Sequence, residues 1–202
     1  MRDWFTRPVV NRVEAIRDTW LKDVTFDYKF FYGRGPDAFR KSDTVFLNAP
    51  DDYHHSDQKI RGVIRYALEH GYDRLLKIDD DVYAYWNRIT ANVPSADYVG
   101  GGPFGPGSAY CSGAAYWLSR KAMEILDRAR AGCWAEDRWV GETLQRANIH
   151  CAFDPRYFVA LQTRSNQYIS DEALAATHDY ITIHSLSPDQ MRREHGRGQP
   201  NH

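Results

Sequence analysis

A short apolar run that leads directly into three carboxylates constrains the fold of this chain more than any other stretch. Residues 75–78 read Leu-Leu-Lys-Ile, and short apolar runs of this kind are typical of buried strands. Asp79, Asp80 and Asp81 follow at once. Because adjacent carboxylates repel one another, a fold needs a reason to hold three of them at a strand end. A bound Mg²⁺ or Mn²⁺ ion would be such a reason, since both ions prefer oxygen ligands and also bind phosphate. The stretch predicts a divalent-metal site, with a solvated acidic turn as the alternative.

Length and charge limit the remaining possibilities. A chain of 202 residues, of which 43% are hydrophobic, is long enough for one domain with a sizeable core. Its 26 basic and 27 acidic residues give a net charge of -1, so there is no electrostatic case for nucleic acid as a partner. From Ser187 onward the sequence is polar. We therefore expect one domain over residues 1–186 and a flexible tail over residues 187–202.

The cysteines and the apolar runs bear on the environment of the chain. Cys111, Cys133 and Cys151 are odd in number and lack paired spacing, which argues against a disulfide framework. One disulfide plus a free thiol stays open, and the spacing does not match a zinc site. No run approaches the roughly 20 apolar residues of a membrane span, and the first residues do not begin a signal peptide. The sequence therefore predicts a soluble chain without a membrane span.

Apolar periodicity divides the chain into alternating strands and helices. Strands are expected at residues 26–32, 44–47, 75–78, 97–100, 150–153 and 180–184, and residues 111–118 alternate between small and bulky side chains. Helices are expected from Asn11 to Trp20 and at residues 56–70, 120–131 and 136–147, with a helical turn at 171–177. Residues 1–10 make a poor strand. Alternation of this kind predicts a largely parallel sheet flanked by helices, with ligands beyond the carboxyl ends of the strands. The three aspartates leave their strand at that edge.

Five ordered motifs carry a resemblance to a known family. They are Ala-Ile-Arg-Asp-Thr-Trp at 15–20, Asp-Asp-Tyr with a following Lys at 51–59, Lys-Ile-Asp-Asp-Asp-Val at 77–82, Tyr-Cys-Ser-Gly at 110–113 and Glu-Asp-Arg-Trp-Val-Gly at 136–141. In this order and spacing they resemble the inverting β-1,3-glycosyltransferases, which include galactosyltransferases, N-acetylglucosaminyltransferases and Fringe. An acidic triplet alone is common, but the ordered set over residues 11–145 is specific.

The resemblance implies a fold and a reaction. The fold is GT-A, a single mostly parallel twisted sheet flanked by helices with a Rossmann-like core that binds a nucleotide sugar. The reaction moves a hexose or N-acetylhexosamine from a UDP-linked donor to a hydroxyl of a carbohydrate acceptor, with a β-1,3 linkage and with Mn²⁺ or Mg²⁺ as cofactor. A metal of this kind would offset the charge that develops on the leaving diphosphate.

Two groups of acidic residues take roles by this resemblance. Asp79 and Asp81 are the leading contacts to the metal, the diphosphate and the ribose, with Asp80 in reserve. An inverting transfer needs one general base for the acceptor hydroxyl. The motif gives that role to Asp137, with Glu136 as the alternative. The alternative for this pair is a purely structural role, as an acidic helix start that the helix dipole favours.

Four further residues are candidates. In the Fringe branch a late histidine completes the metal shell, and His184 follows the last strand in a matching place; a plain polar strand end is the alternative. Arg12, Arg17 and Lys59 are candidate contacts to the nucleotide or its phosphates. Salt bridges that tie helices to the sheet are an equally good interpretation of these three.

Departures from the family pattern leave other interpretations open. Ala115 replaces a motif glycine, Arg138 replaces a valine, and the chain is short. These features fit a cytoplasmic, bacterial or viral-type member as well as a trimmed lumenal domain of a membrane-anchored enzyme. The rival functions are a retaining GT-A transferase, a metal-dependent phosphoryl-transfer enzyme, and a catalytically inactive module that binds nucleotide sugars.

Overall fold

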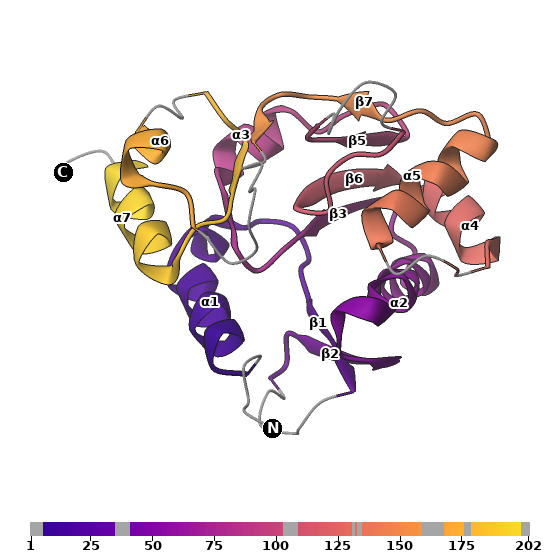
Figure 1. The fold of residues 1–202 in the computed structure, drawn as a ribbon, viewed down its shortest axis with the longest axis horizontal. Helices are drawn as coiled ribbons and strands as arrows, with labels where there is room; N and C mark the ends of the chain where they lie inside the picture. The colour runs from indigo at the N-terminus through magenta and orange to yellow at the C-terminus, as the bar shows by residue number, and fades with distance from the viewer. Residues whose placement is uncertain are drawn as a thin grey trace.

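The computed structural model describes residues 6–34, 41–102, 109–130, 132, 135–158, 168–175 and 179–198. Helices and strands alternate along these residues in an α/β architecture (Figure 1). The helices are α1 (Thr6–Asp18), α2 (Ser56–Glu69), α3 (Trp86–Ala91), α4 (Arg120–Arg128), α5 (Glu136–Arg146), α6 (Asp171–Ala175) and α7 (Pro188–Gly198), with short 3-10 helices η1 (Trp20–Asp23) and η3 (Tyr53–His55). The strands are β1 (Phe30–Arg34), β2 (Thr44–Pro50), β3 (Arg74–Ile78), β4 (Val82–Ala84), β5 (Tyr98–Gly100), β6 (Ala115–Ser119), β7 (Ala152–Phe153), β8 (Tyr157–Phe158) and β9 (Thr182–His184).

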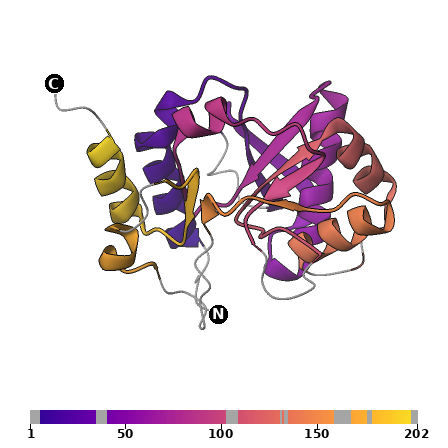
Figure 2. The same cartoon turned by 90° about the horizontal axis from the view of Figure 1, so that it is seen from above.

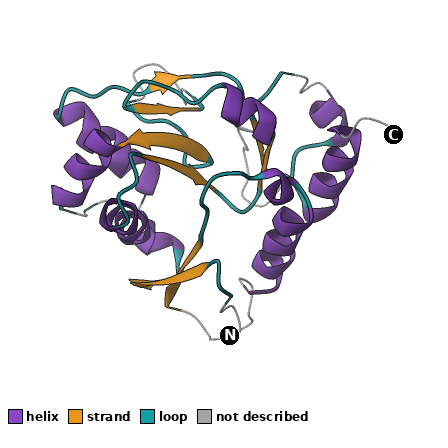
Figure 3. Cartoon of the chain, turned by 180° about the vertical axis from the view of Figure 1, so that it is seen from behind, coloured by secondary structure: helices purple, strands orange, loops and turns teal. Residues whose placement is uncertain are grey.

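The strands pair in three small sheets within the described part of the chain. Their orders are β1–β2, β3–β6–β5–β7 and β4–β9–β8. Three pairs are parallel (β1–β2, β5–β7 and β8–β9), and three are antiparallel (β3–β6, β5–β6 and β4–β9). Figure 3 shows the β1–β2 pair apart from the other strands. The prediction of an α/β fold is therefore confirmed.

The described ladders are not the single, mostly parallel sheet that the sequence predicts. Strand β6 runs antiparallel to both of its neighbours, β3 and β5. The chain also leaves the sheet after β3, because residues 79–81 turn into β4, which pairs with β9 instead. Two separate ladders therefore meet at the acidic turn.

The core consists of two hydrophobic clusters, one on each face of β6. Tyr116 and Leu118 point into the cluster that α2, α4 and α5 complete. Ala115 and Trp117 point into the cluster on the other side, which also contains Ile183 of β9. Successive side chains of a strand alternate between faces, so a strand buried on both sides must be apolar throughout. That requirement explains the apolar run from residue 114 to residue 118.

Helix α7 corrects the prediction of a flexible tail from Ser187. Residues 188–198 form this helix, which packs beside α1 (Figures 1 and 2) and buries Met191 completely. The Ser187 hydroxyl accepts the Gln190 N–H at 3.2 Å, and the Gln190 side chain accepts the Ser187 N–H at 2.9 Å. This reciprocal pair is a capping box, and Pro188 occupies the favoured first helical position. The overall polarity of residues 187–202 suggested a loose tail. The four residues from 187 to 190, however, encode the start of a helix.

The other boundaries differ more modestly from the expectation. The first helix begins at Thr6 instead of Asn11, so the expected poor strand is partly helical. Strand β1 begins at Phe30, and α4 ends at Arg128. No helix among the described residues is both long enough and apolar enough to cross a bilayer.

One disulfide joins two loops of the larger sheet. Cys111 lies before β6 and Cys151 lies before β7, and their Cα atoms are 6.0 Å apart. Of the alternatives that the sequence left open, the structure contains the single disulfide. Cys133 lies outside the described residues.

Candidate functional site

The three aspartates form the turn between β3 and β4, and backbone hydrogen bonds hold both sides of it. The Asp79 N–H donates to the Ala114 carbonyl at 2.9 Å, which extends the β3–β6 ladder by one step. The Asp81 carbonyl accepts the Leu186 N–H at 2.9 Å, just beyond β9. Each end of the triplet is therefore fixed by a different sheet.

Asp81 and His184 face each other across the β4–β9 pair. The ladder aligns Val82 with His184, which places the imidazole Nε2 3.5 Å from Asp81 Oδ1. Burial raises the pKa of Asp81, and the neighbouring His184 opposes that shift. Ser185, which is buried, follows with a φ of 66° in the sparsely populated left-handed region. Strained backbone of this kind concentrates at functional sites.

Asp80 pairs with an arginine from the first helix. Arg12 Nη1 lies 3.3 Å from Asp80 Oδ1, and Nη2 donates to the Tyr168 hydroxyl at 3.5 Å. Burial raises the pKa of Asp80 to about 6; Arg12 opposes this shift, while the charges of the adjacent aspartates add to it. The Nε–H of Arg12 is buried and has no hydrogen-bond partner in the described structure.

Lys77 connects the acidic turn to helix α5. Its ammonium lies 2.6 Å from Asp79 Oδ1 and 2.9 Å from Glu136 Oε1, and it also donates to the Gly113 carbonyl. The side chain is only 17% exposed. Burial alone would lower the pKa of Lys77, but the two carboxylates raise it. Lys77 therefore stays charged and neutralises two carboxylates from different elements.

Glu136 and Asp137 begin α5 in different environments. Glu136 is 13% exposed; one of its oxygens binds Lys77, and the other accepts the Tyr116 hydroxyl at 2.6 Å. Burial raises the pKa of Glu136, and Lys77 opposes that effect. Within the described residues, Asp137 accepts hydrogen bonds from two backbone N–H groups, Gly113 at 3.3 Å and Arg138 at 2.7 Å. Asp137 is the carboxylate that keeps lone pairs for another proton.

The structure thus brings most of the predicted site residues to the acidic turn, in three groups of contacts. Asp79 reaches Glu136 through Lys77, and Gly113 bonds both Lys77 and Asp137. Arg12 with Asp80 and His184 with Asp81 make two further contacts, which the backbone of residues 79–81 joins to the first group.

Arg17 and Lys59 do not join this group. Arg17 Nη2 lies 2.8 Å from Asp43 Oδ1, and the same guanidinium stacks over Phe30 at 4.7 Å. Lys59 pairs with Asp51 at 3.0 Å. Both contacts fit the second interpretation of these residues, in which salt bridges tie the helices to the strands and loops beside them.

Sequence reasoning assigned no role to three residues that the site uses. Lys77 lies two residues before Asp79, and residues two apart on a strand share a face. The sequence could therefore have predicted the contact between Lys77 and Asp79. Tyr116 and Tyr168 are brought in by tertiary contacts, for which the local sequence has no signal.

The acidic turn offers few side-chain donors for the metal that the resemblance implies. In the described part of the chain, no three His, Cys, Asp or Glu side chains are arranged to hold an ion together. Asp81 Oδ1 and His184 Nε2 do face each other, at 3.5 Å. In phosphate-binding sites, Mg²⁺-type ions are held by one or two carboxylates plus the phosphates of the substrate. This donor pair therefore fits an ion that is bound together with a diphosphate.

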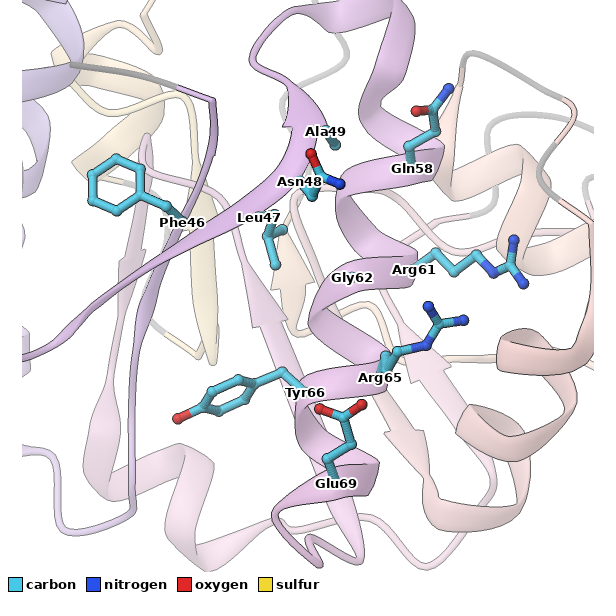
Figure 4. Close-up of a pocket in the computed structure, with 10 residues that line it drawn as sticks. All are labelled: Phe46, Leu47, Asn48, Ala49, Gln58, Arg61, Gly62, Arg65, Tyr66 and Glu69. Carbon is cyan, nitrogen blue, oxygen red and sulfur yellow. The ribbon is translucent and has the colours of Figure 1, made fainter. Parts of the chain in front are cut away.

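An open pocket lies elsewhere, between β2 and α2, and includes none of these residues (Figure 4). The comparisons with known proteins add no assignment to either place. No model of a known protein family matches the sequence, and a search of curated proteins finds no similar sequence.

Proposed function

We propose that this chain is a metal-dependent inverting glycosyltransferase of reduced GT-A architecture. It would transfer a hexose or N-acetylhexosamine from a UDP-linked donor to a hydroxyl of a carbohydrate acceptor, with a β-1,3 linkage. One observation carries the proposal: Lys77 ties the acidic turn, which also contains the Asp81–His184 pair, to the start of α5, where Asp137 follows Glu136.

The acidic turn would hold the donor. Asp81 and His184 offer one oxygen and one nitrogen to a divalent ion, and Asp79 lies beside them. When bound, that ion offsets negative charge on the diphosphate. Arg12 adds a guanidinium at the same turn, with one buried N–H that has no partner among the described residues. A diphosphate is an acceptor that this N–H and the spare guanidinium donors can bind.

Asp137 is the better candidate for the base. Glu136 already uses both oxygens, for Lys77 and for Tyr116, and its charge is neutralised. In the proposed step, Asp137 takes the proton of the acceptor hydroxyl while that oxygen bonds to the anomeric carbon. The bond from this carbon to the diphosphate oxygen breaks, and its electron pair leaves with the diphosphate. Attack from the opposite face inverts the configuration.

The disulfide bears on the compartment. Disulfides persist in oxidising environments and are rare in the cytosol. It favours the trimmed lumenal or secreted interpretation over a cytoplasmic one.

A thermal-shift panel of nucleoside diphosphates and nucleotide sugars, each with and without Mn²⁺, tests the donor site. A ligand of the folded state raises its apparent stability, so we expect the largest metal-dependent rise in Tm with a UDP-sugar. Asp81→Asn should abolish that rise. Asp189→Asn is the matched control, because its carboxylate is 83% exposed on α7. A panel with no metal-dependent shift would contradict the proposal.

The product then separates the rival functions. NMR of the glycosidic product should show inversion at the anomeric carbon, and Asp137→Asn should lower kcat by at least 100-fold while donor binding stays unchanged. Retention would indicate a retaining transferase. Donor binding without product would indicate an inactive module, and turnover of phosphate esters without a sugar would indicate a phosphoryl-transfer enzyme.

A further inference from the structure

A short connection, residues 111–114, leads into β6, and several contacts hold it in place. The disulfide fixes Cys111, and the Ser112 N–H donates to the Gly101 carbonyl at 2.8 Å. The Ser112 hydroxyl accepts the Ala114 N–H at 3.2 Å, which closes the connection on itself. Cys111 and Ser112 are both buried. The connection therefore has little freedom to move, and we call it the 111–114 segment.

The 111–114 segment bonds both parts of the candidate site through its backbone. The Gly113 carbonyl accepts the Lys77 ammonium, and the Ala114 carbonyl accepts the Asp79 N–H at 2.9 Å. The Gly113 N–H donates in the other direction, to Asp137 Oδ2 at 3.3 Å. The segment therefore lies between the acidic turn and the start of α5, and Gly113 contacts residues on both sides.

The space around Gly113 leaves no room for a larger residue. A Cβ at this position would lie 2.8 Å from Glu136 Oε1 and 3.6 Å from Asp137 Oδ2. Glu136 does not give way easily, because Lys77 and Tyr116 hold its two oxygens and its side chain is only 13% exposed. The φ of Gly113 lies outside the left-handed region, so close approach is the reason for a glycine here.

We propose that Gly113 is a positioning residue for the transfer reaction, an inference that rests on the proposed function. Its N–H fixes one oxygen of Asp137, and its carbonyl ties the same residue through Lys77 to Asp79. Gly113 thereby sets the place of the base relative to the acidic turn. A general base acts only within hydrogen-bond reach of the proton that it takes, and a misplacement of about 1 Å can cost about 100-fold in rate.

Gly113→Ala tests the proposal, because the added methyl group must push the start of α5 away. We expect kcat for sugar transfer to fall about 100-fold, measured with the UDP-sugar that gives the largest metal-dependent rise in Tm. The Kd of UDP with Mn²⁺, measured by calorimetry, should change less than about twofold, because only an interaction of the transition state is lost. Gly196→Ala is the matched control: it lies on α7, where an added Cβ meets no atom within 4 Å, and it should change neither quantity.

A second change separates positioning from a general disturbance of the fold. Glu136→Asp shortens the side chain that the added Cβ would meet, so the double variant Gly113→Ala/Glu136→Asp should regain about tenfold in kcat over Gly113→Ala. The positioning role is overturned, and the proposed function stands, if the wild type transfers sugar and Gly113→Ala keeps its kcat. It is equally overturned if Gly113→Ala weakens UDP binding as much as kcat, or if the double variant regains nothing. A wild-type chain that neither binds UDP with Mn²⁺ nor transfers a sugar would overturn the proposed function itself, and the role of Gly113 with it.

Discussion

The two sheets that meet at the acidic turn differ in how much backbone pairing holds them. The β6 half (β3, β5, β6 and β7 with α2, α4 and α5) has a ladder of five aligned pairs between β3 and β6 and an apolar cluster under its helices. The β9 half (β4, β8 and β9 with α1, α6 and α7) has three aligned pairs between β4 and β9 and two between β8 and β9. The β9 half has less backbone pairing to hold it.

Buried polar contacts supplement the pairing in the β9 half. The Tyr85 hydroxyl donates to Glu194 of α7, and the Tyr83 hydroxyl lies 3.3 Å from His195 Nδ1. The Gln190 amide donates to the Ile169 carbonyl at 2.6 Å. Buried polar networks stabilise a fold only when every member is satisfied. We infer that the β9 half is more sensitive to the loss of one side chain.

The candidate site spans this boundary. Asp79 is fixed through Ala114 to the β6 half, and Asp81 is fixed through Leu186 to the β9 half. A ligand that contacts both aspartates would join the two halves. Ligand binding at the site would therefore stabilise the β9 half more than the β6 half, because the β9 half has less backbone pairing.

The largest effect is expected at the junction, from Lys77→Met. This change leaves Asp79 and Glu136 without their shared cation, and removal of one partner from a buried pair costs about 3–5 kcal/mol. Urea unfolding should show that loss. Metal-dependent donor binding should also weaken, because Asp79 loses the cation that holds its side chain at the acidic turn.

Two further variants check this reasoning. Adding Glu136→Gln to Lys77→Met should restore part of the stability, since one unpaired charge disappears. Lys41→Met, at an exposed pair with Glu14, should cost less than about 1 kcal/mol. If Lys77→Met costs no more than Lys41→Met, Lys77 does not hold the acidic turn to α5.

How far the sequence predicted this arrangement depends on the range of the contacts. The acidic turn after β3 and the start of α5 at Glu136 rest on local signals, an apolar run and an acidic helix start, and both are as expected. His184 and Arg12 came from the resemblance, and the fold brings them to the turn. Arg17 and Lys59 show the limit, because a cation near a motif pairs with whichever carboxylate the fold brings close.

Two features lay beyond local reasoning. The antiparallel entry of β6 between β3 and β5 is a long-range choice that apolar patterning does not encode. Helix α7 was misjudged for a different reason: its polar residues include Glu194, which is buried and is bound by Tyr85, a residue more than 100 positions away, and by Arg197. Polarity predicts exposure well only where no distant partner satisfies the polar group.

A smaller effect is expected from the disulfide, which belongs to the β6 half. Cys111→Ala together with Cys151→Ala opens a loop with a sequence separation of 40 and should cost about 2–4 kcal/mol. Hydrogen exchange should show the loss mainly at β5, β6 and β7. Amides of β4 and β9 should keep their protection. Equal loss in both halves would mean that the two sheets unfold as one unit, and the comparison would lose its basis.

The smallest effects come from the two serine caps, one in each half. The Ser119 hydroxyl caps α4 by accepting the Ala122 N–H at 3.2 Å, and Ser187 caps α7 in the same way through Gln190. Each change to Ala should cost about 1 kcal/mol in urea unfolding. Their local consequences should differ: Ser119→Ala leaves α4 held by its apolar face, whereas Ser187→Ala frees the α7 start and should raise hydrogen exchange in α7 and β4 together. If both variants affect only their own helix, the β9 half does not depend on α7, and the sensitivity inferred for it is wrong.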